Sequence, residues 1–296
     1  VQRRQMTTVD RPNIHNIALE GNFDDCQAHV KAMFADEHFR DNVLLSGVNS
    51  INWARIMAQT VYYFTTALAL GAPERKVDFC VPTGNFGDVF AGHVARHMGL
   101  PIGDLVIATN INDILHRTME TGRYEVLGVE ATLSPSMDIQ VSSNFERLLF
   151  EACGRDANHI STLMAGLKQS GSFTLSDEML KYICAGFASG RTDEAQTAEI
   201  IRPTLAETGE VLDPHTAVGY GVARALARKD VPMVTLATAH PPKFPDAVEA
   251  ACGIRPELPQ GMGDLMSRRE RVDVLANDLS TVKQFIVDRT QAGKTS

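Results

Sequence analysis

Two glycines and an asparagine follow a short apolar run at a spacing that could bind an anion. The segment is Val-Pro-Thr-Gly-Asn-Phe-Gly-Asp at 81–88, between the apolar run at 77–81 and a helical pattern at 88–99. A strand that delivers such a loop to a helix N-terminus leaves backbone N–H groups converging where the helix dipole is positive. Gly84 and Gly87 would let the backbone turn sharply and approach the anion closely. The segment therefore predicts a site for a phosphate or another small anion.

The polar residues of this loop have expected roles of their own. Asn85 tolerates unusual dihedral angles and adds side-chain donors, and we expect Asp88 to cap the following helix. No Lys-Ser or Lys-Thr pair follows the second glycine, and the spacing differs from Gly-x-Gly-x-x-Gly, so neither a P-loop nor a dinucleotide site is indicated. A strand-to-helix turn also uses glycine for steric reasons alone, which leaves a purely structural interpretation open.

Three further loops carry small hydroxyl and amide side chains at the expected carboxyl ends of strands. They lie at 46–52, 109–113 and 238–240. Arg55 lies one turn into the helix expected after the loop at 46–52. It adds a permanent charge suited to bidentate contact with phosphate. Taken singly, such residues are as well explained as turns and helix caps. Together they predict one polar site.

The elements needed to position these loops follow an alternating pattern of strands and helices. We expect strands at 13–19, 43–45, 77–81, 105–108 and 231–237, helices at 24–34, 53–70 and 88–98, and nearly continuous helix over 144–228. Strands that alternate with helices imply a parallel sheet covered by helices, which binds its ligands at the carboxyl ends of the strands. This is an α/β fold class.

Composition excludes several classes of function. The 296 residues are 44% hydrophobic with a formal net charge of −8, which argues against nucleic acid or an anionic membrane as a partner. No apolar run approaches the roughly 20 residues that span a bilayer. The five cysteines are scattered and form no Cys-x-x-Cys pair, which favours reduced thiols and a cytoplasmic location.

Several motifs, in order, resemble those of threonine synthase. They are Glu-Gly-Asn-Phe-Asp-Asp-Cys-Gln at 20–27, Asn-Ser-Ile-Asn at 49–52, Pro-Thr-Gly-Asn-Phe-Gly-Asp at 82–88, Ala-Thr-Asn-Ile-Asn-Asp at 108–113, Ser-Pro-Ser-Met-Asp at 134–138 and Ala-Thr-Ala-His-Pro-Pro-Lys-Phe at 237–244. The resemblance covers essentially the whole chain. It implies pyridoxal 5′-phosphate (PLP) fold type II, the tryptophan synthase β-like fold, with a parallel-sheet core, flanking helices and a truncated N-terminus.

The resemblance also implies a reaction and a set of binding residues. Threonine synthases are PLP-dependent carbon–oxygen lyases of threonine biosynthesis that convert O-phospho-L-homoserine and water to L-threonine and phosphate. By the same resemblance, the cofactor-binding residues are Gly84, Asn85, Phe86, Gly87, Asp88 and Thr238, and the substrate-binding residues are Asn49, Ser50, Asn52 and Arg55. Thr238 would be the partner of the pyridine nitrogen, where a hydroxyl, unlike a carboxylate, moderates the electron sink.

One expected feature of the family is missing from this sequence. The Schiff-base lysine belongs to a Phe-Lys-Asp type motif in the N-terminal third of these proteins, and the resemblance places it upstream of Val1. Lys243 alone among the lysines lies in a site motif, and that motif has a different role. We therefore expect the C-terminal two-thirds of a threonine synthase, inactive alone, with 1–57 in the small mobile domain and 58–296 in the large PLP-binding domain.

Other interpretations stay open at this stage. A truncated, non-catalytic homologue could bind a phosphorylated metabolite, and a dehydratase or cysteine synthase would share the fold. His93 and His97 stand four residues apart, but the sequence shows no third ligand beside them, so no metal site is predicted. The sequence leaves the oligomeric state undetermined.

Overall fold

The computed structural model describes residues 1–290, apart from the side chains of residues 23 and 24. The chain divides into two compact units: unit 1 comprises Val1–Val48 and Leu258–Ser296, and unit 2 comprises Asn49–Glu257. This division differs from the expected boundary at residue 57, because the C-terminal segment is grouped with the N-terminal one. That 1–57 belongs to a mobile domain remains a prediction. Among the described residues, no helix is both long and apolar enough to cross a membrane.

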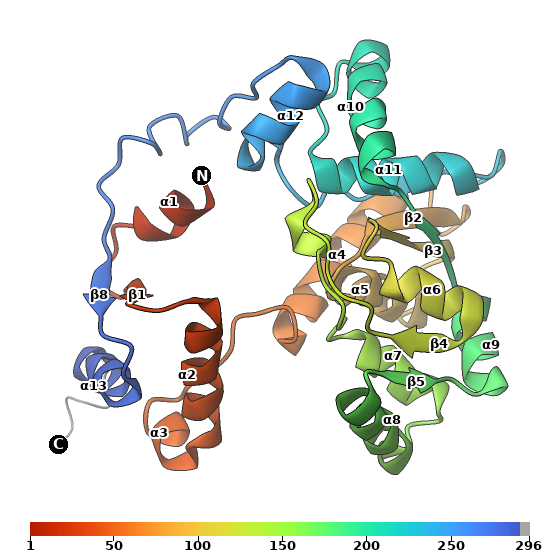
Figure 1. Cartoon of the computed structure of the whole chain (residues 1–296). Coiled ribbons are helices and arrows are strands. Elements are labelled where there is room, and N and C mark those ends of the chain that lie inside the picture. The colour runs from red at the N-terminus through yellow and green to blue at the C-terminus, as the bar shows by residue number, and fades with distance from the viewer. Residues whose placement is uncertain (291–296) are drawn as a thin grey trace. The chain divides into compact units, whose positions relative to one another are not determined.

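Unit 2 is built on a four-stranded sheet in the order β6-β3-β2-β7, of which Figure 1 labels the neighbours β2 and β3. Its strands are β2 (Val77–Pro82), β3 (Ile102–Thr109), β6 (Phe187–Arg191) and β7 (Met233–Thr235), and all neighbours are parallel. A separate antiparallel pair joins β4 (Arg123–Glu125) to β5 (Ser172–Thr174). The helices are α4 (Trp53–Ala69), α5 (Gly87–His97), α6 (Ile114–Thr121), α7 (Phe145–Ala152), α8 (Ala157–Ser170), α9 (Asp177–Gly186), α10 (Glu194–Thr208), α11 (Pro214–Leu226) and α12 (Pro245–Cys252), with short 3-10 turns η1 (Pro135–Met137) and η2 (Pro241–Lys243).

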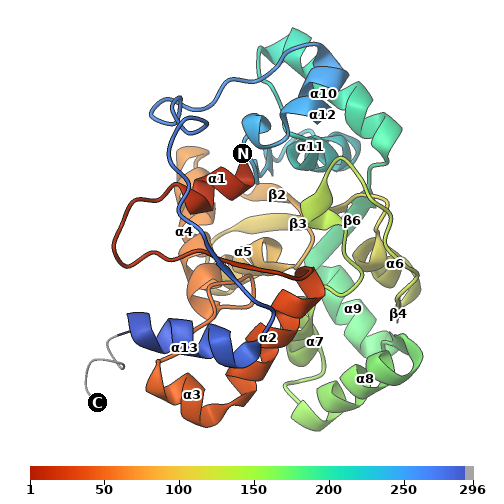
Figure 2. The same cartoon turned by 60° about the vertical axis from the view of Figure 1, so that its left-hand side comes forward.

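The alternation of side chains along the central strands assigns a helix layer to each face of the sheet. Phe79 and Leu105 pack with residues of α4 and α5 in the main core. Cys80 and Val106, one residue further along each strand, pack instead against Val218 and other residues of α11. Figures 1 and 2 show α5 and α11 on opposite sides of β2 and β3. Because both faces are covered, every residue of β2 is buried.

Unit 1 is assembled from the two ends of the chain. Its strands β1 (Ile17–Leu19) and β8 (Asp273–Leu275) pair in parallel, with Ile17 opposite Asp273. Its helices are α1 (Gln2–Thr7), α2 (Phe23–Ala35), α3 (Glu37–Asn42) and α13 (Leu279–Arg289). Met33, Phe39 and Val282 form its small core, which brings α2, α3 and α13 together.

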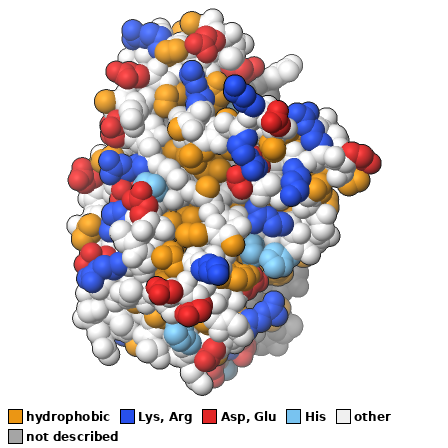
Figure 3. All heavy atoms as spheres, turned by 90° about the vertical axis from the view of Figure 1, so that its right-hand side faces the viewer, with side chains coloured by type: hydrophobic (Ala, Val, Ile, Leu, Met, Phe, Trp, Pro, Cys, Tyr) orange, Lys and Arg blue, Asp and Glu red, His pale blue; other side chains and the backbone are white. Residues whose placement is uncertain are grey.

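The structure corrects some of the expected elements. Residues 43–45 form no strand, because the chain there leaves α3 with Leu44 at φ 52°. Strand 13–19 is reduced to β1, and the helical stretch 144–228 is interrupted by β6, which pairs with β3 in the central sheet. Figure 3 shows one face of the molecule, on which charged side chains of both signs are interspersed with apolar ones.

Candidate active site

A cavity of about 650 Å³ lies in unit 2, beyond the carboxyl ends of β2 and β7. Its walls come from the start of α4, the loop between β2 and α5, η1, the start of α11 and the segment after β7. Eight of the ten residues predicted from the sequence line it, namely Ser50, Arg55, Gly84, Asn85, Phe86, Gly87, Asp88 and Thr238. The structure thus brings together segments separated by almost 190 residues of sequence.

The turn of the glycine loop depends on a different residue from the one expected. Phe86, not a glycine, is the N-cap of α5 and adopts the left-handed conformation, with φ 64°. Its ring is 1% exposed and packs against Phe145 at a centroid distance of 5.3 Å, which holds this unusual backbone in place. Gly84 is required for space instead, since a Cβ there would lie 2.6 Å from the backbone oxygen of Ser136. Because its ring is packed inside the protein, Phe86 offers the cavity only its backbone.

Asp88 does not cap α5 as predicted. It is the second residue of the helix, and the N-cap has no side-chain hydrogen bond. The Tyr62 hydroxyl donates to Asp88 Oδ1 at 2.5 Å, and the Tyr63 hydroxyl lies 2.9 Å from the Asp88 backbone oxygen and 3.0 Å from Oδ1. Burial raises the pKa of Asp88, and the two tyrosine hydrogen bonds oppose that shift. Held by α4, this carboxyl leaves the first turn of α5 free to bind an anion.

The backbone donors of the loop are available to a ligand. Among the described residues, no acceptor forms a hydrogen bond with the backbone N–H groups of 84–86. The first N–H groups of α5 also lack intrahelical acceptors, as in any helix. These donors, at the positive end of a helix that borders the cavity, make a cradle suited to phosphate.

A segment that the sequence did not single out fastens this loop. Asn144 Nδ2 donates to the backbone oxygens of Asn85 at 3.0 Å and Ser50 at 2.9 Å, and its backbone N–H donates to Asn85 as well. The Ser142 hydroxyl donates to the Gly84 oxygen at 2.7 Å. Asn144 is thus a bridge between the glycine loop and the loop that carries Ser50. No signal in the sequence marked it, because its partners are backbone atoms far away in the chain.

The loop before α4 supplies the site only in part. Asn52 is the N-cap of α4, and its side chain accepts from the Ala54 N–H at 2.9 Å. Asn49 is exposed, and its side-chain oxygen accepts from the Ile51 N–H at 3.1 Å. Neither side chain lines the cavity, whereas Ser50 and Arg55 do. The substrate-binding roles of Asn49 and Asn52 therefore stay predictions, and the structure gives each a local role as well.

The loop at 109–113 does not border the cavity, contrary to expectation. Asn110 is completely buried, and its Nδ2 lies 2.9 Å from oxygens of Thr132, Ser134 and Asp138. Asn112 Nδ2 donates to Asp138 Oδ1 at 3.0 Å. The hydrogen bonds of these two amides hold the segment around η1 in place.

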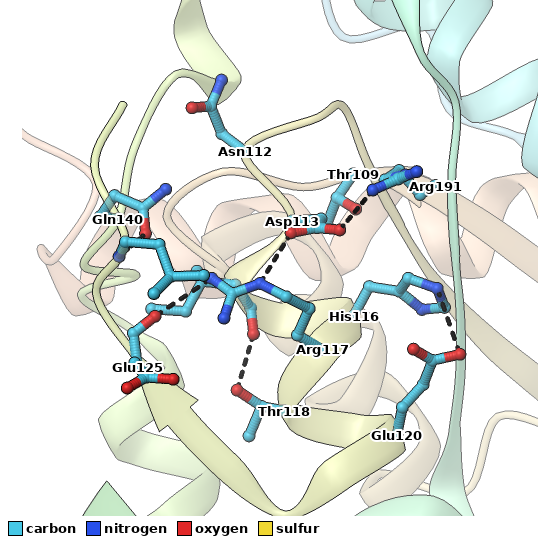
Figure 4. A network of polar contacts seen from close by, with 12 residues as sticks. Thr109, Asn112, Asp113, His116, Arg117, Thr118, Glu120, Glu125, Gln140 and Arg191 are labelled. Atoms are coloured by element: carbon cyan, nitrogen blue, oxygen red, sulfur yellow. Dashed lines mark hydrogen bonds and ion pairs between the residues drawn. The ribbon is translucent and has the colours of Figure 1, made fainter. Parts of the chain in front are cut away.

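Asp113 ends the same loop between two arginines. Its carboxylate lies 2.8 Å from Arg117 Nε and 3.0 Å from Arg191 Nη1, as Figure 4 shows. The interpretation of this loop as turns and caps was the correct one, because the side chains of Asn110, Asn112 and Asp113 are bonded within the protein.

A buried histidine also lines the cavity and was not predicted. His215 Nδ1 lies 2.9 Å from Asp213 Oδ1, and its Nε2 accepts from the Ser136 N–H at 3.1 Å. This pattern assigns a neutral ring with its proton on Nδ1. Asp213 also caps α11 and accepts from the Thr216 hydroxyl. With both nitrogens engaged, His215 positions η1. The Asp-Pro-His-Thr run at 213–216 was the available signal.

Two cations reach the cavity from different parts of the chain. Arg55 comes from the first turn of α4, and Lys243 from η2. Asp88 is the acidic residue in the wall, and burial lowers the tendency of its carboxyl to ionise. The cavity can therefore hold a ligand with more than one negative charge.

Comparisons with known proteins agree with this geometry. A family model described as threonine synthase, C-terminal, matches residues 216–286. The chain is 54% identical to a threonine synthase of Pseudomonas aeruginosa, over 99% of this chain and 63% of that protein, and 45% identical to one of Corynebacterium glutamicum, over 97% and 61%.

Solved structures extend the similarity to three dimensions. A PLP-bound threonine synthase from Brucella melitensis superimposes with a TM-score of 0.94 and 59% identity, over 98% of this chain and 62% of that one. A threonine synthase from yeast gives 0.87 and 38%, over 97% and 62%. The chain spans less than two thirds of the length of these relatives. The predicted fold, PLP fold type II with a parallel sheet and flanking helices, is confirmed.

Proposed function

This chain belongs, over its own length, to the threonine synthase family, and we propose that its cavity is the phosphate-binding part of a threonine synthase active site. The reaction would convert O-phospho-L-homoserine and water to L-threonine and phosphate. One observation carries the proposal: a helix N-terminus with a close-packed glycine loop shares a single cavity with Arg55 and Lys243. One anion site and two separate cations suit a pair of phosphorylated ligands.

The residues present fit PLP. The backbone of Gly84 to Asp88 would hold its phosphate, because those N–H groups form no hydrogen bond with the described part of the chain and adjoin the start of α5. Thr238 lines the same cavity from the segment after β7 and would face the pyridine nitrogen with a neutral hydroxyl. When bound, PLP supplies the electron sink for elimination and replacement. Asp88, held by two tyrosines and with its pKa raised by burial, opposes an incoming phosphate less than a solvated carboxylate would.

The substrate would use the remaining cations. O-phospho-L-homoserine carries a phosphate and a carboxylate, and Arg55, Lys243 and Ser50 lie in the wall to receive them. Asn144 bonds to both Ser50 and Asn85, so it sets the spacing between the substrate loop and the cofactor loop. His215 keeps Ser136 against the cavity and has no free nitrogen with which to move a proton. These residues bind and orient.

The lysine that carries the cofactor covalently is the missing part of this proposal. Among the described lysines, Lys243 is the one that lines the cavity. We assign Lys243 to anion binding because it lines the cavity and its motif has a role other than the aldimine in the resemblance, and we expect the Schiff-base lysine upstream of Val1. On this proposal the chain alone would be inactive, and we propose a cytoplasmic location for an enzyme with a biosynthetic substrate of this kind.

Reduction of a PLP-treated sample with borohydride, followed by peptide mass spectrometry, tests this assignment. We expect weak binding of PLP that inorganic phosphate competes for, and no stoichiometric pyridoxyl adduct. A single adduct on Lys243 would overturn the assignment and make the chain a candidate enzyme by itself. Binding of O-phospho-L-homoserine without any binding of PLP would instead support a non-catalytic homologue that binds a phosphorylated metabolite.

A further inference from the structure

Three side chains with metal-binding atoms converge between α5 and α7, outside the cavity wall. His93 and His97 stand one turn apart on α5, and Glu151 comes from α7. One ligand atom from each residue lies within 4.8 Å of the other two. Sequence spacing showed only the histidine pair, because Glu151 is 58 residues away from His93.

The geometry of the three groups leaves one side open to solvent. His93 Nε2 lies 2.7 Å from Glu151 Oε2, and the two imidazole rings have their centroids 4.3 Å apart. His93 is 5% exposed and Glu151 is half-buried, whereas His97 is exposed. A cation could therefore enter from the His97 side and meet a pre-positioned inner pair of ligands.

A structural role for His93 leaves part of its ring unexplained. Within the described residues, Nδ1 of His93 is buried and has no hydrogen-bond partner. Buried polar nitrogens without a partner are uncommon and costly in free energy.

We propose that His93, His97 and Glu151 bind one divalent cation of the zinc class. Two imidazoles and a carboxylate are donors that Zn²⁺, Co²⁺ and Ni²⁺ accept, and three protein ligands leave a position for water. The cation would enter between His93 Nε2 and Glu151 Oε2, which lie 2.7 Å apart. A neutral His93 that binds the cation through Nε2 carries its one proton on Nδ1, so the ring itself releases no proton.

The surrounding charges set the expected strength of the site. Arg155 Nη2 lies 3.9 Å from Glu151 Oε1, and the Arg96 guanidinium also acts on His93. Tyr182 is the other titratable group facing Glu151. Both arginines oppose a cation, so we expect weaker binding than at a closed site with four protein ligands.

Binding at this site would brace two helices that also serve the cavity. α5 begins at Gly87 in the phosphate cradle, and the residue before α7 is Asn144, which bonds to Asn85. The cation would join the C-terminal ends of these two helices, whereas their N-terminal ends serve the cavity. It would thus raise the stability of unit 2 without contacting any residue of the cavity wall.

A titration of the whole chain with Co²⁺, read by its visible d–d absorption and then by displacement with Zn²⁺, tests the proposal. We expect one equivalent with an intense, low-coordination spectrum and a rise in the melting temperature. His97→Ala and Glu151→Gln should each lower the affinity on the order of tenfold or more. Both residues are at least partly exposed, so the variants should fold, and circular dichroism verifies it.

His116→Ala is the matched control. His116 also has a carboxylate partner one turn away, with Nε2 3.6 Å from Glu120 Oε1 on α6, as Figure 4 shows, yet the pair belongs to no three-ligand group among the described residues. This variant should bind Co²⁺ like the unmodified chain. The proposal is wrong if Co²⁺ keeps its aqueous spectrum, or if His97→Ala and Glu151→Gln bind as tightly as the control.

Discussion

The loops that follow β2 and β3 have similar residue types but make different contacts in the structure. Both leave neighbouring parallel strands of one sheet, and both are rich in small polar residues. The loop at 83–86 borders the cavity and keeps backbone donors without protein acceptors. The loop at 110–113 is buried or nearly so, and its amides are bonded to other side chains. Residue type alone therefore does not identify a binding loop; the first loop is distinguished by the cavity that it borders, and the second by side-chain amides that are already bonded within the protein.

The second loop still supports the site, because it holds a segment that lines the cavity. Asn110 and Asn112 both bond to Asp138, which follows η1. Ser136 and Met137 of η1 line the cavity, and His215 holds Ser136 from the other side. The first loop would bind ligand, and the second would fix the wall against which the first is packed. Substitutions in the first loop should mainly lower the affinity for ligand, whereas substitutions in the second should mainly lower the free energy of unfolding.

Gly84→Ala should have the largest effect on binding. The new Cβ would lie 2.6 Å from the Ser136 oxygen, so the loop must move away from η1. We expect the affinity for PLP to fall on the order of a hundredfold, equivalent to roughly 3 kcal/mol. Quenching of Trp53, the one tryptophan, reports binding. Gly166→Ala, whose Cβ would have only ordinary contacts, is the control, and equal affinity in both variants would refute the steric argument.

Asn110→Ala should act mainly on stability. It leaves oxygens of Thr132, Ser134 and Asp138 without this donor in a buried place, which costs about 2 kcal/mol of unfolding free energy. Chemical denaturation measures the loss. PLP affinity should change by less than in Gly84→Ala. If affinity fell further than stability, the loop at 110–113 would have to contact ligand directly, and the contrast between the loops would fail.

Asn144→Ala should give a smaller effect than either of these two substitutions. It removes the bonds to the backbone oxygens of Asn85 and Ser50, which loosens the loops without introducing a clash. We expect about a fivefold loss of PLP affinity, near 1 kcal/mol, with a slight change in melting temperature. Asn144→Asp keeps an acceptor and loses the donor. If Asn144→Asp bound as well as the unmodified chain, the donated bonds would not be what positions the loops.

Thiol labelling should show the smallest effect and test whether the strand beneath the glycine loop is rigid. Burial raises the pKa of Cys80 on β2 to about 12, so at pH 8 about one thiol in ten thousand is ionised. We expect Cys26 and Cys184, both exposed, to react with a disulfide reagent in the folded chain. Cys80 should react only in denaturant. Rapid labelling of Cys80 under native conditions would show that β2 opens.

Sequence patterns were sufficient where a segment interacts with its own neighbours. The helix at 53–70, the strand at 77–81 and the glycine loop are local patterns, and the structure has all three. β6 was missed because its Phe-Ala-Ser-Gly-Arg sequence is weakly apolar and becomes a strand only by pairing with β3. Asp88, Asn110 and Asn144 were misjudged or overlooked for the same reason. Their partners are distant in the sequence, and no spacing rule includes them.

The pairing of β1 with β8 has a consequence for synthesis of the chain. Asp273 is added to the growing chain 256 residues after its partner Ile17. At about 5–20 residues per second, β1 waits roughly 13 to 50 seconds on the ribosome for its partner. Unit 2 is encoded between the two halves and can complete its sheet before β8 exists. During translation, β1 is thus among the last of the described strands to pair, although it is made before all the others, and its apolar residues are accessible to chaperones throughout that interval.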